Sequence, residues 1–153
     1  MSTERVTREE KELELLQKAR VLYITGQINQ CREIAYLLER RLLSAGILST
    51  VIDNEMLSDG LCQNCKNDNM EFLRQTIEVA KLFINSGIIA ICYGVEDSID
   101  YVNNIVEKSD FILITTNEFV SNDIHSIAIE TETNSIEDVV HDLYKKLAKT
   151  ISQ

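Results

Sequence analysis

Apolar and polar positions follow two patterns that recur along the chain: short, nearly continuous apolar runs and longer amphipathic stretches. Apolar runs of four to eight residues are typical of buried strands, and apolar residues three and four positions apart are typical of helices. The runs predict strands at residues 21–25, 48–53, 88–93, 110–115 and 126–130. The amphipathic stretches predict helices at residues 7–20, 32–45, 68–86, 98–108 and 135–151. Because the strands are apolar throughout and alternate with helices, we expect a five-stranded parallel sheet covered on both faces.

The carboxyl ends of parallel strands are the edge at which such sheets bind ligands. Four residues end predicted strands: Thr25, Asp53, Cys92 and Thr115. Thr25 is followed by Gly26 and, a few residues later, by a helix, which is the layout of a phosphate-binding loop. Such a loop has the pattern G-x-x-x-x-G-K-[ST]. Here the stretch is Gly26-Gln-Ile-Asn-Gln-Cys31-Arg32-Glu33, with one glycine and no lysine.

Composition describes an ordinary globular chain of 153 residues with a net charge of −10. We expect residues 1–20 to form an N-terminal helical extension and residues 21–153 to form a single domain. The negative charge argues against nucleic acid or an anionic membrane surface as a partner. No apolar run approaches the ~20 residues that span a bilayer, and the charged N-terminus lacks a signal-peptide apolar region. A cytoplasmic location is therefore expected.

Six segments, in order and at nearly the right spacing, resemble the adenylylsulfate kinase (APS kinase) family. They are VTREE (6–10), ITG (24–26), AYLLERRLLSAG (35–46), IDNEMLSDGL (52–61), IEVAKLFINSGIIAI (77–91) and SDFILI (109–114). The resemblance implies a three-layer α/β fold like that of P-loop NTPases, and often a homodimer. It also implies phosphoryl transfer from ATP, with Mg²⁺, to the 3′-hydroxyl of adenosine 5′-phosphosulfate.

The chain departs from the family pattern at the phosphate loop. Cys31 carries a Cβ where a glycine lets backbone amides curl around phosphate. Arg32 keeps the charge of the expected lysine on a longer, forked side chain. Glu33 puts a carboxylate where the family has a Mg²⁺-binding hydroxyl, at a helix N-terminus that favours phosphate. The resemblance assigns Gly26, Arg32 and Glu33 to this loop.

The substrate-binding part of the family pattern also has different residues at several positions, and the family's basic lid before the last strand is missing. By position, the resemblance makes Asp53 the catalytic carboxylate of an active enzyme and leaves Glu55 and Arg74 as substrate-binding residues. Because several parts of the site have changed together, we expect a catalytically inactive protein that needs no cofactor. Its role would be regulatory, structural or adenosine-nucleotide-sensing, in sulfate assimilation, with another protein as partner. The alternative is an active kinase that uses ATP and Mg²⁺.

The cysteines support a third hypothesis. All four come from segments expected at the ligand edge: Cys31, Cys62, Cys65 and Cys92. Four thiolates on the same side of the sheet could bind zinc or an iron–sulfur cluster where the nucleotide would sit. The alternative is that Cys92 is a buried apolar residue and that the others are ordinary thiols.

Overall fold

The fold is built on one parallel sheet of five strands. The computed structural model describes residues 4–61, 69–94, 99–116 and 125–151. The strands lie in the order β2-β3-β1-β4-β5 and all pairs are parallel. Their bounds are Val21–Thr25 (β1), Ser49–Val51 (β2), Ile89–Gly94 (β3), Phe111–Thr115 (β4) and Ser126–Ala128 (β5). The predicted five-stranded parallel sheet is confirmed.

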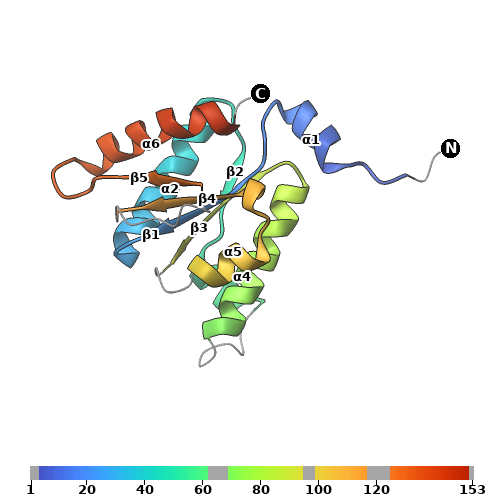
Figure 1. The fold of residues 1–153 in the computed structure, drawn as a ribbon, viewed down its shortest axis with the longest axis horizontal. Coiled ribbons are helices and arrows are strands. Elements are labelled where there is room, and N and C mark those ends of the chain that lie inside the picture. The colour runs from blue at the N-terminus through green and yellow to red at the C-terminus, as the bar shows by residue number, and fades with distance from the viewer. Residues whose placement is uncertain (1–3, 62–68, 95–98, 117–124, 152–153) are drawn as a thin grey trace.

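Helices cover both faces of the sheet (Figure 1). The first face packs against α2 (Ile28–Ser44) and α6 (Ile136–Ile151), and the second against α4 (Asn69–Asn85) and α5 (Ile99–Ile105). Leu22 and Ile24 of β1 enter the first core, whereas Val21 and Tyr23 enter the second. This alternation follows from the two-residue period of a strand. No helix in the described part of the chain is long and apolar enough to cross a membrane.

Three boundaries differ from the sequence-based expectation. Helix α2 begins four residues earlier than predicted, at Ile28, because Gln27 caps it. The first helix is shorter: α1 spans Arg8–Leu15, and the left-handed conformation of Leu16 (φ 54°) ends it. A short helix that the pattern did not predict, α3 (Asn54–Asp59), follows β2 and is capped by Asp53.

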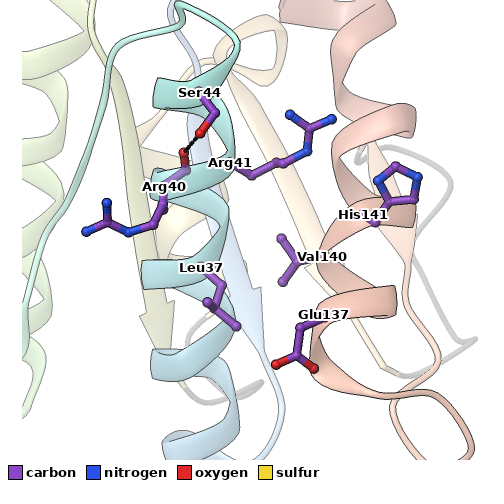
Figure 2. Close-up of a pocket in the computed structure, with 7 residues that line it drawn as sticks. All are labelled: Leu37, Arg40, Arg41, Ser44, Glu137, Val140 and His141. Atoms are coloured by element: carbon purple, nitrogen blue, oxygen red, sulfur yellow. Dashed lines mark hydrogen bonds between the residues drawn. The ribbon is translucent and has the colours of Figure 1, made fainter.

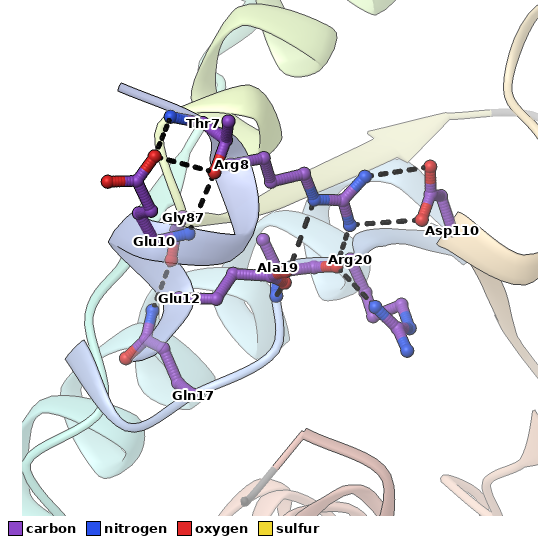
Figure 3. Close-up of polar contacts among 9 residues, drawn as sticks. All are labelled: Thr7, Arg8, Glu10, Glu12, Gln17, Ala19, Arg20, Gly87 and Asp110. Carbon is purple, nitrogen blue, oxygen red and sulfur yellow. Dashed lines mark hydrogen bonds and ion pairs between the residues drawn. The ribbon is translucent and has the colours of Figure 1, made fainter. Parts of the chain in front are cut away.

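Polar contacts fix α1 to the N-terminal edge of the sheet (Figure 3). Arg8 donates from both terminal nitrogens to Asp110, at 3.0 and 2.9 Å, and from one of them to the Ala19 carbonyl at 2.6 Å. The Glu12 carboxylate accepts from the Ala19 amide at 2.6 Å. Asp110 directly precedes β4 and Ala19 lies two residues before the start of β1, so α1 is attached where these strands begin. The division of the chain at residue 20 stays a prediction.

Gln17 connects two further strands to this edge. Its side-chain amide donates to the carbonyls of Leu48 and Gly87, both at 2.8 Å, and its carbonyl accepts from the Leu48 amide at 2.8 Å. Leu48 precedes β2 and Gly87 precedes β3. The Gln17 side chain is 1% exposed, so this bridge is formed away from water. The N-terminal edge cluster, defined as Arg8, Glu12, Gln17 and Asp110, therefore joins the starts of four strands.

Candidate functional site

The connection between β1 and α2 lies at the carboxyl edge of the sheet and is only two residues long. Gly26 has a φ of +147°, which an L side chain rarely adopts, and Gln27 is the N-cap of α2. The side-chain carbonyl of Gln27 accepts from the Gln30 amide at 2.7 Å, and the backbone carbonyl of Gln27 accepts from the Cys31 amide at 2.9 Å. The amides of Gln30 and Cys31 are thus used within the first turn of the helix.

This geometry differs from what the phosphate-loop pattern implies. A phosphate nest needs successive backbone N–H groups that turn toward one anion. From Ile28 onward the backbone is helical, so its amides follow the helix axis instead. The Cys31 sulfur fills space beside the loop, since a Cβ added to Gly26 would lie 3.4 Å from it. Residues 28–33 therefore extend α2 into the stretch where a phosphate loop would be.

The arginine that takes the place of the phosphate-loop lysine points to an aspartate at the end of β2. Arg32 Nε and one terminal nitrogen each lie 3.4 Å from Asp53 Oδ2. The Tyr36 hydroxyl donates to the same oxygen at 2.5 Å. The same terminal nitrogen of Arg32 lies 4.0 Å from a carboxylate oxygen of Glu55. We call these four residues, Arg32, Tyr36, Asp53 and Glu55, the carboxyl-edge cluster.

Asp53 is the centre of this cluster, and most of the hydrogen-bonding capacity of its carboxylate is occupied. Its side chain is 4% exposed, whereas that of Arg32 is 47% exposed. Asp53 Oδ1 accepts from the amides of Glu55 (2.8 Å) and Met56 (3.4 Å), which makes it the N-cap of α3. With the contacts from Tyr36 and Arg32, both carboxylate oxygens have at least two donors. A general base needs a free lone pair directed at its substrate, and Asp53 has little capacity left.

The protonation of the cluster follows from these contacts. Burial raises the pKa of Asp53, but the hydrogen bonds from Tyr36 and the two amides, with the charge of Arg32, outweigh it and hold this pKa below its usual value. Donation to Asp53, aided by burial, raises the pKa of Tyr36 to about 12. At neutral pH Asp53 is therefore a carboxylate that accepts from the Tyr36 phenol and pairs with the Arg32 guanidinium.

The side chains of the other residues assigned from the resemblance are exposed or pair within their own helix. Glu33 is exposed, and Glu55 is 79% exposed. Arg74, on α4, is paired with Glu71 of the same helix, with nitrogen–oxygen distances of 2.9 and 2.6 Å. The roles proposed for Glu33, Glu55 and Arg74 stay predictions.

The expectation that the cysteines share one side of the sheet is wrong for the two that the structure describes. Cys31 is buried in the core under α2 and α6, whereas Cys92 is buried in the core under α4 and α5. Neighbouring residues of a strand point to opposite faces, and Ile91 of β3 already occupies the first core. Burial raises the pKa of Cys31 to about 11 and that of Cys92 to about 12, so both are thiols.

A metal site that uses both Cys31 and Cys92 is excluded by this placement. Cys62 and Cys65 lie outside the described residues. Within residues 4–61, 69–94, 99–116 and 125–151, no group of three or more His, Cys, Asp or Glu is arranged to hold a metal ion.

Two tyrosines belong to this site and were missed from the sequence. Tyr36 lies four residues after Arg32 on the same helix, a spacing that puts the two side chains on one face, and the Arg32 guanidinium lies 5.7 Å from its ring centre. Tyr93, near the end of β3, interacts with Arg32 and with the backbone at Asn54, while burial raises its pKa. The i,i+4 spacing could have identified Tyr36, but no local signal identifies Tyr93.

A parallel sheet with helices on both faces, and with its first loop and Asp53 at the carboxyl edge, has the three-layer fold of P-loop NTPases. Solved structures agree on the fold. An APS kinase of Mycobacterium tuberculosis aligns with a TM-score of 0.69 at 22% identity, covering 85% of this chain and 98% of that chain. A hexameric APS kinase from Thiobacillus denitrificans aligns with a TM-score of 0.67 at 20% identity, covering 88% of this chain and 29% of that one.

Comparison of sequences identifies the family. The model of the adenylylsulphate kinase family matches residues 18–146, and the chain belongs to this family. An adenylyl-sulfate kinase of Bacteroides thetaiotaomicron is 34% identical over 114 residues, which are 70% of this chain and 57% of the relative. One of Clostridium kluyveri is 36% identical over 114 residues, with the same two coverages. The chain thus spans a little over half the length of these curated relatives.

The predicted family and fold are confirmed by these matches. The predicted loss of activity is not confirmed: nothing in the comparisons shows it, and the names of the relatives support the alternative of an active kinase better. Which of the two holds depends on the site.

Proposed function

We propose that this protein is a member of the APS kinase family that does not transfer phosphate and acts by binding. The observation that supports this proposal is the Arg32–Asp53 pair beside a helix that already starts at Ile28. The residue in the phosphate-loop lysine position neutralises the residue in the catalytic position. Family membership connects the role to sulfate assimilation, as a regulator, a structural component or a sensor of an adenosine nucleotide.

The described residues do not fit ATP with Mg²⁺. Cradling a phosphate would require Arg32 to leave Asp53 and the first turn of α2 to unwind. It would also place the phosphate near Glu33, and two like charges ~4 Å apart cost about 1–4 kcal/mol near a protein surface. Phosphoryl transfer depends on positioning and on electrostatic stabilisation of the phosphate. The helical start of α2 affects the first, and the Arg32–Asp53 pair and Glu33 affect the second. We derive no catalytic step through the nucleotide.

The second candidate is an active adenylyl-sulfate kinase, which the names of the relatives favour. In that case Asp53 is the catalytic carboxylate, Gly26, Arg32 and Glu33 bind ATP and Mg²⁺, and Glu55 and Arg74 contact adenylyl sulfate. Both candidates include a cytoplasmic location and association as a homodimer or with another protein. Neither includes nucleic acid or a membrane as partner.

An assay of ADP release with ATP, Mg²⁺ and adenylyl sulfate separates the two candidates. We expect no turnover above background and only weak ATP binding by calorimetry. The matched variant is Cys31→Gly/Arg32→Lys/Glu33→Ser, which restores G-x-x-x-x-G-K-S and frees Asp53. We expect this variant to bind ATP at least about tenfold more tightly, a gain of roughly 1.4 kcal/mol. Wild-type turnover near ~1 per second, the low end for kinases, would establish the second candidate instead.

A further inference from the structure

A groove between α2 and α6 has features of a binding surface that the family site does not explain. Figure 2 shows Leu37 and Val140 between the two helices, with charged side chains around them. The groove has a volume of about 340 Å³ and is lined by Leu37, Arg40, Arg41, Ser44, Glu137, Val140 and His141. Its apolar floor and its rim, with two arginines and a histidine against one carboxylate, suit a ligand that is both apolar and negatively charged.

The two arginines have no acidic partner of their own. Within the described residues, no carboxylate lies within 4.0 Å of Arg40 or Arg41. The Arg41 guanidinium instead lies 4.1 Å from the ring centre of Tyr144. Stacking of this kind holds a guanidinium in place while its N–H edges stay available to carboxylates.

The arrangement excludes a single small anion as the intended ligand. In Figure 2, Arg40 and Arg41 point to opposite sides of α2, so their donors do not converge on one point. A second, smaller groove of about 270 Å³ shares Leu37 and Arg40 with the first and continues toward β2. Its other lining residues are Tyr36, Glu39, Leu43 and Ser49. The surface is therefore extended, with Arg40 between its two halves.

We propose that this surface, called here the α2/α6 groove, binds an acidic segment of a partner protein that carries apolar side chains. Apolar residues of the segment pack on Leu37, Val140 and Leu43, which is 57% exposed. Carboxylates on both sides of the segment pair with Arg40 and Arg41. Of the two acids on the surface, Glu39 already accepts from the Val51 amide at 2.8 Å, and Glu137 lies at the end opposite Ser44 (Figure 2). The proposal holds whether or not the protein transfers phosphate.

Fluorescence anisotropy with synthetic peptides tests the proposal on the full chain. The probe is a labelled helical peptide of about 16 residues with Leu and Glu at i, i+4 spacing, and its control has Lys in place of each Glu. We expect only the acidic peptide to bind, and binding to weaken as NaCl rises from about 0.05 to about 0.5 M, because exposed charges are screened. Arg40→Glu should weaken binding at least about tenfold, since a like charge then faces the peptide.

Matched variants make the test specific. Lys108→Glu makes the same change of charge at an exposed site before β4 and should leave the affinity unchanged. Arg41→Lys keeps the charge but loses the fork, so it should weaken binding by a smaller factor than Arg40→Glu. Within the described residues the Arg40 side chain has no ion pair to lose, and circular dichroism checks that each variant is folded. Equal binding of both peptides, or an Arg40→Glu variant that binds like wild type, overturns the proposal. So does sedimentation of the wild type as a dimer that Arg40→Glu converts to a monomer, because a second copy of the chain then covers the groove.

Discussion

Two polar clusters lie at opposite edges of the same sheet and differ in geometry. The N-terminal edge cluster pairs Arg8 with Asp110 through two contacts of 2.9–3.0 Å, with both side chains less than 20% exposed. The carboxyl-edge cluster pairs Arg32 with Asp53 at 3.4 Å, and the arginine is 47% exposed. The first pair is bidentate, short and shielded, whereas the second is longer and its cation faces water.

We interpret the first cluster as structural and, under the proposed function, the second as a converted binding site. Bidentate arginine–carboxylate pairs are the strong ones, and at the N-terminal edge they join strands that are distant in sequence. The carboxyl edge is where parallel sheets bind ligands. At this edge, Arg32 occupies the position of the phosphate-loop lysine. Its ion pair with Asp53 is long and half-exposed, so breaking it costs little free energy. The comparison predicts that changes at the first cluster affect stability, and that changes at the second affect binding more than folding.

The largest expected loss of stability follows from Arg8→Ala. The substitution leaves Asp110 without its Arg8 donor and removes one of two donors to the Ala19 carbonyl, which still accepts from Arg20 at 2.7 Å. Removing one partner of a buried pair costs roughly 3 kcal/mol. Urea unfolding followed by circular dichroism measures this loss. The matched control is Arg5→Ala, an exposed arginine on the same segment, with an expected change within about 0.5 kcal/mol. Equal effects of the two variants would mean that α1 is not held by the cluster.

Asp53→Asn should have a smaller effect that depends on pH. Asparagine still caps α3 but loses the charge that binds Arg32 and Tyr36, so we expect a loss of about 2 kcal/mol at pH 7. The pKa of Asp53 is below its usual value of ~3.9, so the folded state binds fewer protons than the unfolded state as pH falls. The stability from this carboxylate is complete above pH ~4 and disappears as pH falls through the folded-state pKa.

Wild type and Asp53→Asn should therefore converge in stability at acidic pH. Urea unfolding measured at several pH values between neutral and acidic conditions checks this, with Asp138→Asn as control because Asp138 is exposed. A difference between wild type and Asp53→Asn that stays constant down to the acidic limit would show that the charge of Asp53 plays no part.

Much of the fold could be predicted from the sequence, because each strand and most helices are indicated by a pattern within one short segment. The strands are apolar runs such as FILIT at 111–115, and β1 and β4 are found within the predicted bounds. Helix α3 was missed because its six residues are too few to show a helical period. The early start of α2 was missed because residues 29 and 30 are polar and Ile28 is 42% exposed, so the amphipathic pattern begins only later.

The site was harder to predict because its contacts are not local. The resemblance identified Arg32 and Asp53, yet their pairing depends on where β2 ends relative to α2. The Arg8–Asp110 pair joins residues 102 positions apart, and no pattern along the chain indicates it. The sides of Cys31 and Cys92 could have been deduced, since Cys92 alternates with Ile91 and Tyr93, which face the first core. That deduction would have removed the four-cysteine hypothesis.

The smallest expected effect, that of Arg32→Ala, tests the comparison most directly, because it repeats the Arg8→Ala substitution at the other edge. Without Arg32, Asp53 keeps the Tyr36 hydroxyl and the amides of Glu55 and Met56. The lost pair has an exposed cation in high dielectric, and pairs of this kind add little to stability. The loss in urea unfolding should be roughly a fifth or less of that caused by Arg8→Ala. If the two losses are equal, the Arg32–Asp53 pair is a structural element like the Arg8–Asp110 pair, and the carboxyl edge can no longer be regarded as a converted binding site.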